Sequence, residues 1–130
     1  MELTVTRGVI DRLHAEAART SPEECCGVLL GREGHIDAVV PAANVADDRL
    51  RRFEIDPLAL LAAHRAAREG GPQVLGYYHS HPEGHPVPSA TDCEHSTGDL
   101  RIWAIIADAT VAFWRDSGDG FDQLAVRIVA

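Results

Sequence analysis

The run Gly-Val-Leu-Leu-Gly at residues 27–31 constrains the fold more strongly than any other segment of this chain. A short, continuous apolar run bounded by glycines is typical of a β-strand that is buried on both faces. Gly34 then favours a turn, and residues 35–40 have the pattern expected of a hairpin partner. The sequence therefore predicts a buried sheet that contains a hairpin at this point.

The rest of the chain predicts helices as well as strands. The predicted helices are residues 7–19, capped by Thr6; the segment that begins at Asp56-Pro57 and stops at Gly70; and the segment from Ser89 to Gly98. The other predicted strands are residues 3–6, 53–55, 74–80, 102–107, 110–114 and 121–129. These elements predict an α+β fold over residues 1–130, a single compact domain whose mixed sheet of about six or seven strands is flanked by about three helices.

Charge and composition exclude several functions. The chain of 130 residues carries a net charge of −8. Nucleic acids and anionic membrane surfaces are bound by clustered lysines and arginines, so we expect neither as the main partner. No apolar stretch is long enough to span a bilayer, and the N-terminus lacks a signal-peptide core. The 3 cysteines do not form a disulfide framework, so we expect reduced thiols and a cytoplasmic protein.

The strongest chemical signal is the sequence His79-Ser80-His81-Pro82. Residues two apart on a strand project from the same face, so His79 and His81 can offer two imidazoles to one ion. Pro82 turns the chain away, and the loop returns at Ser89, one helical turn before Asp92. Zinc binds imidazole nitrogens and carboxylate oxygens at about 2.0–2.2 Å. Three protein ligands would leave a fourth position for water, as in catalytic zinc sites.

Each part of this pattern has an ordinary structural interpretation when it stands alone. A His-x-His pair on a strand is usually not a metal site. Ser89 and Asp92 suit a helix start, because serine caps helices and an acidic side chain favours the first turn. The occurrence of both parts together favours the metal interpretation.

These residues resemble the JAMM metalloprotease motif, which marks the active form of the MPN domain. The motif reads His-x-His-Pro, a loop and Ser-x-x-Asp, and residues 79–82 and 88–92 match it. Residues 22–31 are similar to the Pro-x-Glu-x-Cys-Gly segment of bacterial members, which runs into a Leu-rich strand. In this alignment the catalytic glutamate of the family falls on Glu24. The resemblance covers the chain from the first helix to the strand at 102–107 and implies a JAMM/MPN-like metallopeptidase domain.

The resemblance also implies a mechanism. One Zn²⁺ would be held by His79, His81 and Asp92, with a zinc-bound water as nucleophile. Glu24 would accept the proton of that water and pass it to the leaving amine. Ser89 would donate a hydrogen bond to the tetrahedral oxyanion, although its hydroxyl is also placed to cap a helix.

Family members cut peptide or isopeptide bonds after the C-terminal Gly-Gly of ubiquitin-like proteins, and small bacterial members resemble hydrolases that process sulfur-carrier proteins. This chain lacks room for the long insertions of eukaryotic deubiquitinases, so a sulfur carrier or another ubiquitin-like protein is the partner that the resemblance implies. Two alternatives stay open at this point. One is a non-catalytic MPN scaffold module, which need not hold metal, and the other is a zinc amidase that acts on small peptides.

Several other residues carry weaker expectations. The arginines within residues 49–52 form a basic patch, which we expect to help grip an acidic partner. One of Cys93 and His95 is expected to pack against the sheet. The substrate tail is expected to run beside residues 53–55 or beside the loop at 80–88.

Overall fold

The computed structural model describes residues 3–130, so the first two residues of the predicted domain lie outside the described part. The sheet has eight strands rather than the predicted six or seven. The strands are β1 (Leu3–Thr6), β2 (Cys26–Arg32), β3 (His35–Ala42), β4 (Gln73–Ser80), β5 (Ile102–Ala107), β6 (Thr110–Asp116), β7 (Phe121–Gln123) and β8 (Val126–Val129). The helices are α1 (Arg7–Thr20), α2 (Pro57–Arg68) and α3 (Ala90–Glu94).

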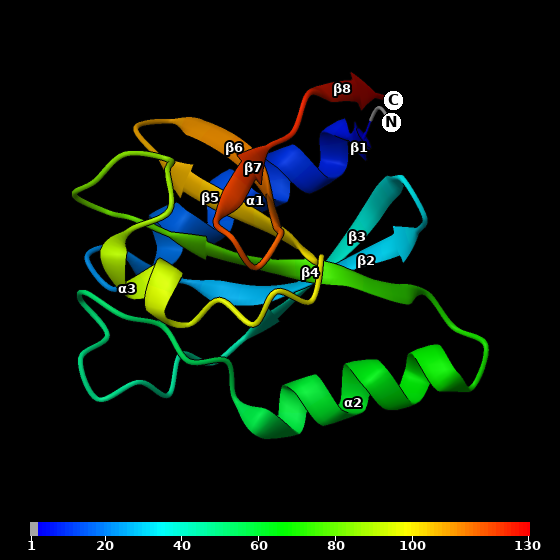
Figure 1. Ribbon diagram of the computed structural model, residues 1–130, viewed down its shortest axis with the longest axis horizontal. Helices are drawn as coiled ribbons and strands as arrows, with labels where there is room; N and C mark the ends of the chain where they lie inside the picture. Colours follow the sequence, from blue (N-terminus) through cyan, green and yellow to red (C-terminus); the bar gives the residue numbers. More distant parts are fainter. Residues whose placement is uncertain (1–2) are drawn as a thin grey trace.

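The sheet is mixed, with the order β7-β6-β5-β4-β2-β3-β1-β8 (Figure 1). The buried run predicted from the sequence is confirmed, because β2 lies between β3 and β4, and Val28 and Leu29 are both 0% exposed. β4 and β5 are parallel, so the chain must cross over between them. The crossover consists of residues 81–101 and carries α3, and it begins where the His-x-His motif ends.

The two faces of the sheet have different roles. On one face α1 packs behind the strands in Figure 1, and Tyr78 belongs to the core cluster that includes Val9 and Leu13 of this helix. The predicted cap is present, since Thr6 Oγ1 accepts a hydrogen bond from the Val9 backbone. On the other face lie α2, α3 and the loops around them. Alternation along β4 places Tyr77 and its second neighbour, His79, on this other face.

The predicted helix of residues 89–98 is wrong in extent, and the predicted strand of residues 53–55 is wrong altogether. α3 ends at Glu94 instead of Gly98, because the following backbone amides are bound by a side chain of β6, described below. Residues 53–55 form no strand, and only an isolated bridge joins Asn44 to Ile55.

The predicted strand of residues 121–129 is also wrong, because it is two strands at opposite edges of the sheet. Leu124 packs against the core at the break, and its backbone amide bonds to Phe113 of β6. After Ala125 the chain pairs with β1 instead, beginning with Leu3 opposite Val126. The periodicity of this segment is continuous, so only the tertiary pairing reveals the break.

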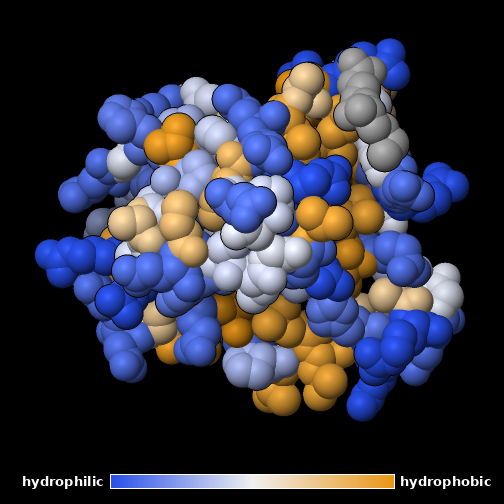
Figure 2. Space-filling view, viewed as in Figure 1, coloured by the Kyte–Doolittle hydropathy of each residue, from blue (hydrophilic) through white to orange (hydrophobic). Residues whose placement is uncertain are grey.

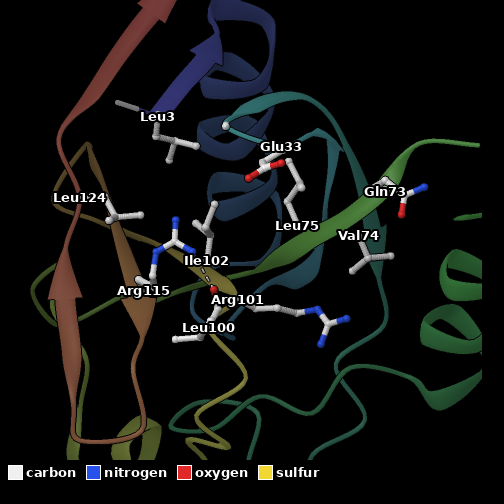
Figure 3. A pocket seen from close by; sticks show the side chains of 11 residues that line it. Leu3, Glu33, Gln73, Val74, Leu75, Leu100, Arg101, Ile102, Arg115 and Leu124 are labelled. Atoms are coloured by element: carbon white, nitrogen blue, oxygen red, sulfur yellow. Dashed lines mark hydrogen bonds between the residues drawn. The ribbon is translucent and has the colours of Figure 1, made fainter. Parts of the chain in front are cut away.

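Two surface features complete the description. Within residues 3–130 none of the helices has the length and apolarity needed to cross a bilayer. A hollow of about 270 Å³ opens where β4 and β5 begin, with Leu75 and Ile102 in its wall (Figure 3). This hollow is at the opposite end of β4 from the His-x-His motif, so it is separate from the site described next.

Candidate active site

The His-x-His motif lies at the end of β4, with His81 as the first residue after the strand, and its three side chains alternate as the sequence predicts. His79 and His81 face the crossover segment. Ser80 points the other way, is 1% exposed, and accepts a hydrogen bond of 2.8 Å from the Cys25 backbone amide. Ser80 therefore fastens the end of β4 to the start of β2, beside the segment that carries Glu24.

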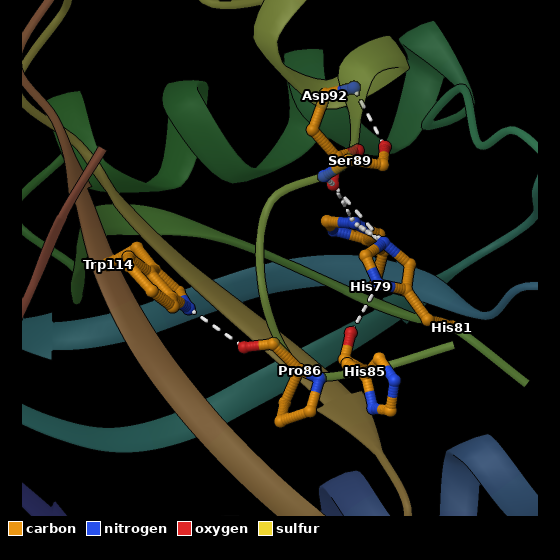
Figure 4. Close-up of polar contacts among 7 residues, drawn as sticks. All are labelled: His79, His81, His85, Pro86, Ser89, Asp92 and Trp114. Atoms are coloured by element: carbon orange, nitrogen blue, oxygen red, sulfur yellow. Dashed lines mark hydrogen bonds and ion pairs between the residues drawn. The ribbon is translucent and has the colours of Figure 1, made fainter. Parts of the chain in front are cut away.

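The third predicted ligand meets the two imidazoles. His79 Nε2 lies 3.0 Å from His81 Nε2 and 3.1 Å from Asp92 Oδ2, and His81 Nε2 lies 3.2 Å from the same oxygen (Figure 4). In a tetrahedron with zinc bonds of about 2.0–2.1 Å, neighbouring ligand atoms are about 3.3–3.4 Å apart. The spacing of the three donor atoms therefore fits a single tetrahedral ion.

The protonation of His81 adds a chemical argument for a cation. Its Nδ1 lies 2.8 Å from the carbonyl oxygen of His85, so Nδ1 carries a proton. In the neutral ring Nε2 is then an acceptor, and it faces the Asp92 carboxylate, which also only accepts. Either a proton or a metal ion must lie between them. Burial is the largest single effect and opposes the charged form, but the hydrogen bonds to Asp92 and to the His85 carbonyl, together with the charges of Asp92 and Glu24, outweigh it and raise the pKa of His81.

His79 is almost completely enclosed. It is 1% exposed and stacks on Phe53, with ring centroids 4.2 Å apart and planes inclined by 16°. The edge of Trp103 closes another side, at a centroid distance of 5.7 Å. Burial lowers the pKa of His79, although Asp92 opposes this shift. A neutral imidazole is the form that binds metal, so the aromatic enclosure favours ligation.

Glu24 lies beside the ligands because of strand register. Cys26 pairs with His79, and the Ser80 amide bonds to the Cys25 carbonyl, so the antiparallel register places Glu24 opposite His81. Glu24 is 6% exposed, and burial raises its pKa from 4.5 to about 7, an effect that His81 opposes and Asp92 reinforces. A carboxyl group with a pKa near neutrality suits a general base.

This raised pKa predicts an effect on stability in the metal-free protein. Between pH 4.5 and about 7 the folded chain holds a proton on Glu24 that the unfolded chain has lost, so this group makes the fold less stable as the pH rises through that range. We expect Glu24→Gln to raise Tm at pH 8 and to leave Tm unchanged at pH 4, as measured by thermal denaturation. Glu23→Gln, at a partly exposed neighbour, should show no such gain with pH.

Ser89 begins α3 with a reciprocal capping box. Its Oγ accepts from the Asp92 amide at 3.0 Å, and its own amide donates to Asp92 Oδ2 at 2.9 Å. The predicted cap is therefore present, and it also orients the third ligand. The acceptor role uses a lone pair of the hydroxyl, so the O–H proton is still available to a substrate.

Ser89→Ala is expected to lower both rate and stability. Loss of one oxyanion donor typically costs about 10²–10³ in kcat, and loss of a helix cap costs about 1 kcal/mol. The matched control is Asp56→Ala, which removes the cap of α2, where Asp56 Oδ1 accepts from the Leu58 amide at 3.0 Å. Steady-state kinetics and thermal denaturation should show a Tm loss in both variants and a rate loss only in Ser89→Ala. An unchanged kcat in Ser89→Ala would leave the cap as its only role.

The candidate catalytic groups share one groove. A groove of about 310 Å³ is lined by Glu24, His81 and Ser89, together with the exposed apolar side chains of Leu50 and Val87. On the other side of His79 lies an apolar hollow of about 370 Å³. The hollow is lined by Phe53, Glu54, Ile55, Pro57, Leu60, Tyr77, His95, Thr97, Asp99 and Trp103. The hollow therefore lies beside the aromatic side chains that enclose His79, and the groove lies beside Glu24, His81 and Ser89.

Two weaker expectations are changed by the structure. Cys93 and His95 are both exposed, so neither packs against the sheet, because α3 turns them outward. Arg49 pairs with Glu23 at 3.2 Å and Arg51 pairs with Asp48 at 3.3 Å, so part of the basic patch is neutralised within the chain. Its role in gripping a partner stays a prediction.

Two groups that contact the predicted metal ligands were not predicted from the sequence. Phe53 was expected only to flank a substrate tail, yet it stacks on the predicted ligand His79. The carbonyl of His85 fixes the tautomer of His81, whereas its side chain lies in solvent. A backbone carbonyl in a loop leaves no residue-type signal, so only the fold could reveal this contact.

The fold and this arrangement define a JAB/MPN domain of the JAMM type. The chain belongs to the family described as prokaryotic homologs of the JAB domain, which matches residues 6–117. The resemblance inferred from the motif is therefore confirmed.

Several curated proteins are similar over most of the chain. A desampylase of Haloferax volcanii is 33% identical over 123 residues, which cover 92% of this chain and 88% of that protein. A probable TtuB-protein conjugate cleaving protease of Thermus thermophilus is 37% identical over 116 residues, covering 89% and 78%. A CysO-cysteine peptidase of Mycobacterium tuberculosis is 30% identical over 97 residues, covering 73% and 66%.

Solved structures show the same architecture. A protein from Desulfitobacterium hafniense superposes with a TM-score of 0.86 at 28% identity, covering 98% of this chain and 92% of that one. A JAB1/MPN domain protein from Archaeoglobus fulgidus superposes with a TM-score of 0.64 over 97% of this chain and 98% of that one. The Archaeoglobus fulgidus protein is only 17% identical to this chain, so this similarity supports the fold alone.

Proposed function

We propose that this chain is a zinc-dependent peptidase or isopeptidase. It hydrolyses the bond after the C-terminal Gly-Gly of a ubiquitin-like protein of the sulfur-carrier type. It acts in the cytoplasm, and residues 1–130 form one catalytic domain. The observation that carries the proposal is the convergence of His79 Nε2, His81 Nε2 and Asp92 Oδ2 within 3.0–3.2 Å of one another. Glu24 and Ser89 line the groove beside them. A metal-free scaffold would not need these groups together.

The proposed mechanism assigns a separate task to each side chain. A zinc ion held by His79, His81 and Asp92 would acidify water and polarise the scissile carbonyl. Glu24, whose ionised form predominates above about pH 7, accepts the proton of the attacking water and then delivers it to the departing amine. The Ser89 hydroxyl donates to the oxygen that gains negative charge in the tetrahedral transition state.

The shape of the surface beside the site favours a thin tail. The extended segment at 53–55 uses one edge to bond with Asn44 and Val45, while its residues also line the hollow beside His79. A substrate strand lying there would approach the backbone closely, and glycine permits this approach without a side-chain clash. A Gly-Gly terminus suits an approach of this kind beside the hollow.

The names of the relatives support this substrate class. One relative is named a probable TtuB-protein conjugate cleaving protease and another a CysO-cysteine peptidase, so each name pairs a cleaving activity with a joined substrate. Sequence identities of 37% and 30% support a related substrate for this chain. The three cysteines are free thiols, which agrees with the proposed cytoplasmic setting.

The decisive experiment uses ubiquitin-like carriers that bear extra residues after Gly-Gly. The purified chain, supplied with one equivalent of Zn²⁺, is incubated with these carriers, and mass spectrometry identifies the cut. We expect a single cleavage after Gly-Gly, abolished by a chelator and by Glu24→Gln. A chain that neither holds stoichiometric zinc nor cleaves any carrier would favour the scaffold alternative. Equal efficiency on short peptides and on folded carriers would favour the small-peptide amidase.

The apolar face of α2 gives a further prediction about the partner. Leu58 is 73% exposed and Leu61 is 51% exposed, next to the hollow that Leu60 lines. Hydrophobic side chains gather along the lower rim of the view in Figure 2, where α2 lies in Figure 1. Such a patch, next to the hollow beside His79, is expected to contact the folded body of the carrier protein.

We therefore expect the double variant Leu58→Asp, Leu61→Asp to raise KM for a folded carrier about 10-fold, the loss of two interface side chains. Its kcat on a short Gly-Gly peptide should not change. Ile128→Asp, at a residue of edge strand β8 that is 43% exposed, is the matched control. Equal KM values in all three proteins would show that this face of α2 is not used.

A further inference from the structure

The crossover segment at residues 81–101 carries three of the candidate active-site residues, yet it has little regular structure of its own. His81, Ser89 and Asp92 all lie within it, and its one helix, α3, is 5 residues long. Metal ligands must be held within about 0.5 Å of the productive geometry, which requires support from outside the ligand set. The segment therefore needs fixed points on the sheet.

Trp114 of β6 provides the first fixed point. Its indole Nε1 donates a hydrogen bond of 3.1 Å to the carbonyl oxygen of Pro86 (Figure 4). The preceding residue, His85, offers the carbonyl that lies 2.8 Å from Nδ1 of His81. The indole thus holds the peptide next to the one that sets the tautomer and ring orientation of a ligand.

Asp116, two residues further along β6, provides the second fixed point. It is 0% exposed, and its Oδ2 accepts hydrogen bonds from the amides of Thr97 and Gly98 at 3.0 and 3.2 Å. Its Oδ1 accepts from the Ser96 hydroxyl and from the Gly118 amide. Both carboxylate oxygens are therefore used, and three consecutive residues just after α3 are tied to the sheet.

The hydrogen bond from Trp114 and the hydrogen bonds to Asp116 act as two tethers, which flank the ligand-bearing part of the segment. Alternation along a strand places Trp114 and Asp116 on the same face of β6. Trp114 is also paired with Trp103, whose ring contacts His79, so this is the face on which the site lies. One tether precedes Ser89 and Asp92 in the chain, and the other follows them.

We propose that Trp114 and Asp116 are positioning residues of the metal centre. Trp114 acts through the peptides of residues 85–86 on His81, and Asp116 acts through residues 96–98 on the helix that carries Asp92. This inference rests on the metal site of the proposed function. Outer partners that orient metal ligands typically contribute about 10–100-fold to metal affinity, and we expect losses of that size from each tether.

The test uses two conservative variants and Co²⁺ as the spectroscopic probe. Trp114→Phe keeps an aromatic side chain, although a smaller one, and removes the N–H donor. Asp116→Asn keeps the shape but replaces one of two acceptor oxygens with an NH₂ group, which opposes the amide donors it faces. Co²⁺ affinity is measured by absorbance in competition with a chelator, and amide hydrogen exchange of residues 86–98 is followed in the metal-free proteins. If Asp116→Asn does not fold, Ser96→Ala, which removes a single donor, replaces it.

Phe113→Leu is the matched control, because Phe113 is a core residue of the same strand, 2% exposed, in the cluster that packs with α1. We expect this control to lower Tm without changing Co²⁺ affinity or the Co²⁺ spectrum. Both tether variants should weaken Co²⁺ binding about 10–100-fold and accelerate exchange in the segment. Unchanged Co²⁺ affinity in the tether variants, or an equal loss in Phe113→Leu, would overturn the inference. A parent chain that fails to bind Co²⁺ would overturn the proposed function and this inference with it.

Discussion

Replacing Glu24 with glutamine is expected to lower kcat about 10²–10⁴-fold while the zinc content stays that of the parent chain. The amide keeps the size of the side chain but cannot accept a proton from water. Glu24 is also not among the three donor atoms that converge on the metal position, so metal binding should not change. Steady-state kinetics on a carrier with a Gly-Gly extension, together with metal analysis of the same sample, checks both parts.

The neighbouring acid supplies the control for this prediction. Glu23 precedes Glu24 in the chain, but its carboxylate pairs with Arg49 on the surface at 3.2 Å. Glu23→Gln is therefore expected to keep full activity. The assignment of the base to Glu24 fails if Glu23→Gln loses as much rate as Glu24→Gln, or if Glu24→Gln keeps the parent rate.

Replacing Asp92 with asparagine should abolish productive zinc binding. Asp92 Oδ2 is the atom that both imidazoles face. Burial alone would raise the pKa of this carboxyl, but hydrogen bonding to His79 and His81 holds the pKa far below its ordinary value. A neutral amide loses the charge that balances the cation. Because loss of an outer partner alone costs about 10–100-fold in affinity, loss of this ligand should cost at least 100-fold.

Zinc-dependent stability gives an independent readout of this loss. At a free zinc concentration 100 times Kd, binding stabilises the folded state by about 2.7 kcal/mol, so zinc should raise the Tm of the parent chain. Asp92→Asn should show no such rise at the same concentration. Asp37→Asn, which changes an exposed acid on β3, should behave like the parent. A zinc-induced rise in Tm that survives in Asp92→Asn would place the metal elsewhere.

The fold was predictable where local rules and tertiary packing agree. The apolar run at 27–31 and the caps at Thr6 and Asp56 have their predicted roles. The predicted strands at 102–107 and 110–114 leave two residues for a turn between them, and β5 and β6 are joined by a turn at Asp108 and Ala109. The turn residues have φ values of 50° and 60°, as a two-residue hairpin connection requires. The errors arose where tertiary contacts override a local pattern. Asp116 binds the amides that would have continued α3, and pairing with β1 divides the last strand.

The sequence by itself determined which chemical groups are available for the site. The spacing of His79 and His81 places them on one face of any strand, and Ser89 with Asp92 forms a capping box in any helix, because both relations depend only on local backbone geometry. Tertiary structure decided how these groups meet. Strand register brings Glu24 opposite His81, and the parallel crossover returns Asp92 to the end of β4. Contacts such as Phe53 on His79 or Trp114 on Pro86 join residues distant in the chain, and no local periodicity encodes them.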